Sequence, residues 1–139
     1  MGLFAGDRPS TLGVRDGRLA PCPTSPNCVS SQTPSEDAEH LIAPLAFPPA
    51  AQGDPARAWE VLERAVRELE RTIVITARPG YLHAEASTAL LGFVDDLECL
   101  LDPAARVIHV RSASRVGYSD LGVNRKRVEA LRARLASAR

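Results

Sequence analysis

Apolar residues recur at helical spacing in the middle of the chain, directly after two residues that favour a helix start. Asp54 can accept a hydrogen bond as the N-cap, and Pro55 suits the first helical position because it has no N–H to leave unpaired. The apolar positions that follow are Ala58, Trp59, Leu62, Ala65, Val66 and Leu69. This pattern predicts an amphipathic helix that ends near Arg71, with the Trp59 side in the core.

Two short stretches with alternating apolar residues come next. Residues 73–77 and 81–87 predict strands, and Pro79 with Gly80 favours a tight turn between them. Pairing Ala77 with Leu82 assigns the two sides of this hairpin. The predicted core side holds Ile73, Ile75, Leu82, Ala84 and Ala86, and the other side holds Tyr81, His83 and Glu85.

A second pair of strands is predicted over residues 93–101 and 107–110, with a turn at residues 102–105. We place three pairs opposite each other: Leu101 with Arg106, Glu98 with His109, and Asp96 with Arg111. The members of the last two pairs then lie on one face, the side away from the core. We therefore expect a buried or half-buried ion pair between Asp96 and Arg111.

The end of the chain predicts a second helix that continues to about Ala136. Its apolar positions are Val128, Leu131 and Leu135. The start has two alternatives. With Asn124 as N-cap, three cations occupy the first turn, where the helix dipole is already positive and a bound anion would be favourable. With Ser119 as N-cap, Asp120 sits there instead and no anion is needed.

Residues 1–53 differ from the rest of the chain because they hold eight of the eleven prolines. Proline disfavours long helices and central strands. We predict a flexible N-terminus over residues 1–18 and one globular domain over residues 19–139. Within that domain, residues 19–53 form an extended wrap, and residues 54–139 form helix, four strands and helix. The fold class is α+β, a four-stranded antiparallel meander flanked by two helices, with a proline-rich N-terminal wrap.

Polar side chains gather around the predicted sheet. The candidates for a polar cluster are His83, Glu85, Asp95, Asp96, Glu98, His109 and Asp120. One interpretation is a set of cross-strand pairs that only stabilises the sheet. The others are a divalent metal bound by two histidines and a carboxylate, and acid and base catalysis by paired carboxylates. Two histidines on strands that are not neighbours are a weak metal signal, so no metal or other cofactor is predicted.

A basic segment covers residues 111–127. Its candidate residues for binding an anion or a partner are Arg111, Ser112, Ser114, Arg115, Asn124, Arg125 and Arg127. Guanidinium groups donate in a fixed fork that suits phosphate and carboxylate. The segment therefore predicts contact with an anionic small molecule or a protein partner. In the alternative, Arg115 and Arg127 pair with Asp95 and Asp120 and lock the segment onto the sheet.

The composition limits the classes of function. A length of 139 residues with 45% hydrophobic residues suits one domain with a real core. The chain has three Phe, two Tyr and one Trp, and none alternates with basic residues, so nucleic-acid binding is not expected. No stretch predicts a membrane span or an export signal, so we expect a cytoplasmic protein.

Cys22 and Cys28 lie six residues apart in the proline-rich region. Reduced thiols are the favoured state in a cytoplasmic protein, and a disulfide that closes this short loop is the alternative. Zinc is the weakest reading, because the spacing is not CxxC and no second ligand pair follows. Cys99 is expected to be a small core residue.

Two motifs carry a resemblance to a known family. They are PCPTSPNCVSSQ near the start, and FVDD followed by RSASRVGYSDLGVNRKRVEALRARL near the end. With them, the chain from about Leu19 to Leu135 resembles the domain-of-unknown-function family 1499. The resemblance implies kinship without a mechanism. Since GxSxG, P-loop, GxGxxG and HExxH motifs are absent, we expect a non-enzymatic binding or accessory domain. The alternative is an enzyme of unrecognised class that uses the polar cluster.

Overall fold

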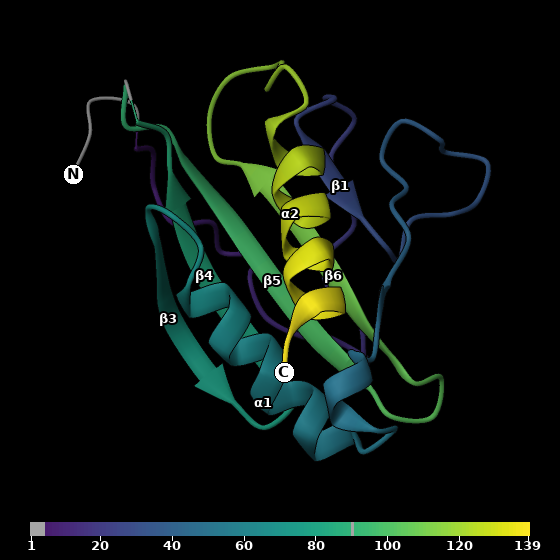
Figure 1. Ribbon diagram of the computed structural model, residues 1–139. Coiled ribbons are helices and arrows are strands. Elements are labelled where there is room, and N and C mark those ends of the chain that lie inside the picture. The colour runs from purple at the N-terminus through teal and green to yellow at the C-terminus, as the bar shows by residue number, and fades with distance from the viewer. Residues whose placement is uncertain (1–4, 90) are drawn as a thin grey trace.

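One antiparallel sheet carries both helices on the same face in the computed structural model, which describes residues 5–89 and 91–139 (Figure 1). The strand order is β1–β6–β5–β4–β3, and β2 also pairs with β6. The strands are β1 (Cys28–Ser30), β2 (Leu45–Ala46), β3 (Thr72–Arg78), β4 (Tyr81–Ser87), β5 (Val94–Asp102) and β6 (Val107–Ser114). The helices are η1 (Pro49–Ala51), α1 (Pro55–Arg67) and α2 (Val123–Ser137).

The α+β class is confirmed, and the prediction of a four-stranded sheet is wrong. The meander β3–β4–β5–β6 is present, but β1 and β2 from the predicted wrap add to its β6 edge, so the sheet has six strands. An extended proline-poor stretch of two or three residues is enough to pair with an edge strand.

Both helices bury an apolar side against the sheet. Asp54 caps α1 as predicted, since its side chain accepts a hydrogen bond from the N–H of Ala56. α2 begins at Val123 after Gly122, whose φ of 80° is left-handed, so neither Asn124 nor Ser119 is the N-cap. The core between helices and sheet includes the fully buried residues Leu62, Leu82, Leu97, Ile108, Val110, Val128 and Leu131.

A β-bulge changes the predicted faces of β3. Ala77 pairs with Leu82 as expected, but the register shifts between Val74 and Thr76. Val74 therefore packs on the core, whereas Ile73 is 68% exposed. The prediction that Ile73 and Ile75 lie in the core is wrong, because the extra residue of a bulge reverses the alternation beyond it.

The register of β5 and β6 differs from the prediction by two residues. Asp102 pairs with Val107, so Arg111 lies opposite Glu98 and not opposite Asp96. The turn has the expected four residues but lies one residue later, at residues 103–106, where Arg106 adopts a left-handed φ of 58°. A shift of two keeps every side chain on its predicted face and changes every partner. The predicted Asp96–Arg111 pair is therefore wrong.

Residues 5–21, which we call the strap, lie on the face of the sheet opposite the helices, where Figure 1 shows them as a purple trace. Backbone N–H of Gly13 donates to Glu98, and Pro21 accepts from Arg111. Gly6 has a φ of 72°, and a Cβ there would lie 2.9 Å from a methyl group of Val116. Residues 1–4 of the predicted flexible N-terminus lie outside the described residues, and the flexibility of residues 5–18 stays a prediction.

A disulfide joins Cys22 to Cys28, so the expectation of reduced thiols is wrong. The two Cα atoms lie 5.7 Å apart, within the range that a disulfide spans. The bond closes the loop between the strap and β1. Cys99 is a free, fully buried cysteine, as expected.

We expect reduction of this disulfide to lower the free energy of unfolding by about 2 kcal/mol, because a six-residue loop loses only a modest closure entropy. Urea unfolding with and without a phosphine reductant measures the difference. The double variant Cys22→Ser with Cys28→Ser is the control and should not respond to the reductant. Equal wild-type stability in both conditions would contradict the expectation.

Candidate functional site

The candidate polar residues divide into two groups on opposite faces of the sheet. Under the strap lies the strap cluster: Tyr81, His83, Glu85, Asp96, Glu98, Arg111 and Arg115. Beside the start of α2 lies the helix cluster: Asp95, Ser112, Ser114, Asp120, Asn124 and Arg127. Alternation along β5 separates the neighbours Asp95 and Asp96, so one joins each cluster.

Asp96 is the centre of one half of the strap cluster. Its Oδ1 lies 2.7 Å from Nε2 of His83, and Arg115 donates to both of its oxygens at 2.8 Å. Arg115 also donates to Glu85, which accepts a second hydrogen bond from Arg8 of the strap at 2.7 Å. Asp96 and His83 are 2% and 3% exposed, so the inner part of this chain is buried, whereas Glu85 is partly exposed and Arg8 lies at the surface.

Glu98 is the centre of the other half. Its Oε2 accepts from the hydroxyl of Tyr81 at 2.6 Å and from the N–H of Gly13 at 2.8 Å. Its Oε1 lies 3.9 Å from Arg111, too far for a hydrogen bond. Oε1 of Glu98 and Nε of Arg111 are buried without a hydrogen-bond partner among the described residues. This pair is therefore held by charge more than by hydrogen bonds.

The electrostatics of the strap cluster follow from burial and pairing. Burial alone would raise the pKa of Asp96, but the hydrogen bonds from Arg115 and His83 outweigh it and hold this pKa below its usual value. Burial raises the pKa of Tyr81, and its hydrogen bond to Glu98 raises it further. Burial also lowers the pKa of Arg111. At neutral pH the half around Asp96 is thus an ionised network.

His83, Glu85 and Asp96 bring three possible metal ligands within 4.8 Å of one another. The guanidinium of Arg115 donates to both carboxylates, so it already supplies the positive charge that they require. A His–Asp pair is also a common general base. Here the pair is buried, since His83 and Asp96 are 3% and 2% exposed. The geometry favours the interpretation in which the cluster holds the strap on the sheet.

Asn124 is the centre of the helix cluster. Its Oδ1 accepts from Ser112 and Arg127, and its Nδ2 donates to Ser114, Asp120 and the carbonyl of Asn27. Arg127 also pairs with Asp95 at 2.8 Å. Asp120 accepts from the N–H groups of Gly122 and Asn124 and so satisfies the first turn of α2. This pairing matches the predicted anchor alternative for Arg127.

Two candidates lie outside both clusters. His109 contacts Asp102 at 3.3 Å and Ser31 at 3.1 Å, so the structure does not bring it together with His83. Arg125 donates to the carbonyl of Glu39. The sequence therefore predicted most members of the clusters, but it did not predict their separation into two.

A family model described as "Protein of unknown function (DUF1499)" matches residues 18–135. The chain belongs to this family. Neither a curated protein nor a solved structure matches the chain. The DUF1499 match runs from the strap through α2, so it includes both polar clusters. No helix among the described residues of this DUF1499 chain is long and apolar enough to cross a membrane.

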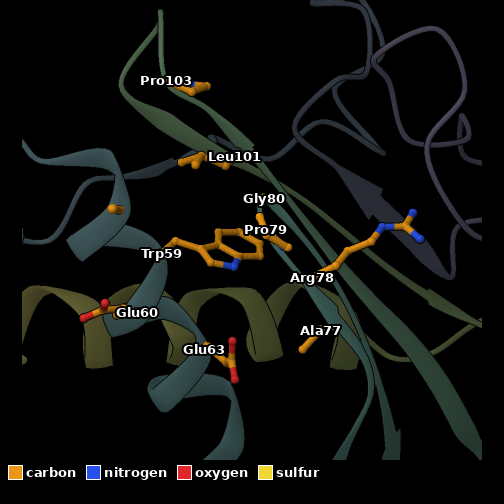
Figure 2. A pocket seen from close by; sticks show the side chains of 10 residues that line it. Trp59, Glu60, Glu63, Ala77, Arg78, Pro79, Gly80, Leu101 and Pro103 are labelled. Carbon is orange, nitrogen blue, oxygen red and sulfur yellow. The ribbon is translucent and has the colours of Figure 1, made fainter.

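An open cavity of about 690 Å³ lies at the other end of the DUF1499 domain, between the start of α1 and the β3–β4 turn (Figure 2). Its apolar lining includes Ala56, Trp59, Pro79, Leu101 and Pro103, and its polar lining is Glu60, Glu63 and Arg78. From the sequence, Trp59 is expected only in the core. The signal for a cavity is the proline in each of two turns, Pro79 and Pro103, which the fold brings together beside the exposed start of α1.

Trp59 has an unusual environment for a core tryptophan. Its side chain belongs to the core cluster and only 8% of the residue is exposed. The indole N–H makes no hydrogen bond within residues 5–89 and 91–139, and the nitrogen is not among the buried polar atoms that lack a partner. Figure 2 shows the indole at the centre of the cavity. The cavity therefore contains a fixed and unused hydrogen-bond donor.

Proposed function

We propose that this protein is a non-enzymatic binding domain whose ligand enters the Trp59 cavity. The observation that carries the proposal is the free indole N–H in an open, mostly apolar cavity of about 690 Å³. Binding sites of this size commonly combine apolar walls with a few fixed polar groups. The indole nitrogen is not among the fully buried polar atoms, so water can accept from it, and a ligand with an acceptor group can take the place of that water.

The polar clusters support a binding function over an enzyme. Every member of the strap cluster contacts another member or the strap, and its His–Asp pair is buried. Arg111, Arg115 and Arg127 are likewise engaged with carboxylates inside the protein. Anion binding by the basic segment stays a prediction, and it would require one of these guanidinium groups to exchange its internal carboxylate for the ligand.

Titration with neutral amides tests the cavity. The chain has one tryptophan, so its ¹H–¹⁵N spectrum contains one indole cross-peak. We expect benzamide and N-acetylproline methylamide to shift this cross-peak saturably, because the carbonyl group of each ligand accepts a hydrogen bond from the indole N–H. The cross-peaks of the backbone amides of residues 77, 78 and 80 should shift with it.

A pair of matched variants controls this experiment. Ala56→Phe fills the cavity from an exposed helical position, and Ala130→Phe adds the same ring at an exposed position of α2. The first variant should abolish the shift, and the second should keep it. A spectrum in which neither amide moves the indole cross-peak, or in which Ala56→Phe changes nothing, would overturn the proposal.

The cytoplasmic location stays a prediction. The Cys22–Cys28 disulfide supports an oxidising compartment, since such bonds rarely persist in the cytoplasm.

A further inference from the structure

We infer that the Trp59 cavity recognises an arginine or lysine residue within an extended peptide, with Glu63 as the counter-charge. This inference rests on the proposed binding function and names the class of ligand. The evidence comes from three features of the cavity lining: its charge, its apolar surface and its one hydrogen-bond donor.

The charge of the lining favours a cation. Two carboxylates, Glu60 and Glu63, border the cavity against one cation, Arg78. The guanidinium of Arg78 lies over the ring of Tyr81 at 4.7 Å, and Figure 2 shows it turned away from the indole. Arg67, outside the lining, pairs with Glu63 through Oε2 alone, so the other carboxylate oxygen of Glu63 is the charged atom left for a ligand in the cavity.

Glu63 is the carboxylate placed to meet that cation. In Figure 2 it lies beside the indole, whereas the carboxylate of Glu60 is turned away. Arg67 donates twice to Oε2 of Glu63, at 3.0 and 3.3 Å. Oε1 accepts no hydrogen bond from the described residues and is free for a ligand. With one third of its side chain exposed, Glu63 needs little rearrangement to bind.

The remaining lining matches the rest of a basic residue. The aliphatic stem of arginine or lysine packs well on apolar and aromatic surface while its charged end stays near water. Trp59, Pro79 and Leu101 offer such a surface next to Glu63. The indole N–H then requires an acceptor, and the backbone carbonyl of an extended peptide supplies one. A free organic cation would satisfy the carboxylate and leave the indole unpaired.

A series of blocked pentapeptides with one variable central residue tests the inference. The central residue is arginine, its neutral isostere citrulline, or glutamate, and the other four are alanine. The indole cross-peak of Trp59 reports binding. We expect the arginine peptide to bind about fivefold more tightly than the citrulline peptide, as one partly exposed ion pair contributes. The glutamate peptide should bind most weakly.

Variants and a fourth probe separate the possible failures. Glu63→Gln should remove the difference between arginine and citrulline, and Glu70→Gln, whose side chain is 82% exposed and away from the cavity, should not. Equal binding of both peptides to the wild type would overturn the cation assignment while the cavity remains a binding site. A preference that survives Glu63→Gln would overturn the role of Glu63.

Propylguanidinium, which has the cation and stem without a carbonyl, should bind more weakly than the arginine peptide. Equal binding would show a free organic cation as the ligand and overturn the peptide assignment. If neither the peptides nor the neutral amides shift the cross-peak, the proposed function itself fails. The results thus distinguish a wrong ligand class from a wrong binding function of the cavity.

Discussion

Arg115→Met is expected to lower the free energy of unfolding by about 3–5 kcal/mol, because it leaves the buried Asp96 without its guanidinium partner and Glu85 with Arg8 alone. The Arg115 side chain is 3% exposed and donates to Asp96 and Glu85, which are 2% and 19% exposed at their side chains. Chemical denaturation measures the loss. Arg125→Met is the matched control, because Arg125 contacts only a backbone carbonyl of Glu39 among the described residues, and we expect it to cost less than about 1 kcal/mol.

The effect of Arg115→Met should depend on pH. Burial alone would raise the pKa values of Asp96 and Glu85. Hydrogen bonds from Arg115 and His83 to Asp96, and from Arg8 and Arg115 to Glu85, hold both pKa values below their usual values. A carboxyl group with a lowered pKa stabilises the fold fully above its unfolded pKa, near 4, and loses that contribution as the pH falls further. The difference between wild type and variant should therefore shrink below about pH 4. If Arg115→Met costs no more than Arg125→Met at pH 7, Arg115 does not stabilise the fold as the partner of these carboxylates.

Glu98→Ala is expected to cost about 3–5 kcal/mol as well, because it leaves Arg111 as an uncompensated buried charge. It also removes the acceptor for the hydroxyl of Tyr81 and for the N–H of Gly13. Glu98→Gln keeps an acceptor and removes only the charge, so its cost should be smaller. Denaturant unfolding of both variants separates the two contributions.

A double-mutant cycle identifies the partner of Arg111. Combining Glu98→Gln with Arg111→Met should cost clearly less than the sum of the single changes, because each single change leaves the other charge unpaired. The same cycle with Asp96→Asn in place of Glu98→Gln should give a smaller coupling, since Asp96 pairs with Arg115 and His83. A larger coupling for Asp96 would restore the pairing predicted from the sequence.

The sequence predicted the sheet face of a side chain more reliably than its partner on the neighbouring strand. Asp96, Glu98 and Arg111 lie on their predicted side because strand alternation has a period of two. Their pairing depended on the position of one turn, which lies one residue later than predicted and has a left-handed backbone at Arg106 that a propensity argument does not anticipate. The wrong prediction for Ile73 has a similar cause. The β-bulge in β3 is a local backbone conformation, and the pattern of apolar residues does not reveal it.

The candidate site was also predicted only in part from the sequence. Asp95–Arg127 was foreseen as an anchor, because opposite charges at the two ends of the basic segment can meet. The Trp59 cavity was not foreseen, because its walls come from three separate segments that only the tertiary fold brings together. The disulfide also depends on a local Cα separation, 5.7 Å, that residue spacing alone does not give.

The strap has a consequence for assembly. It contacts the rest of the domain mainly through one face of the sheet, as its bonds to Glu85, Glu98 and Arg111 show. A second copy of the chain offers an identical face, so two copies can exchange straps and keep every one of these contacts. Such domain-swapped dimers are favoured at high concentration, and the hinge would lie just before the Cys22–Cys28 loop.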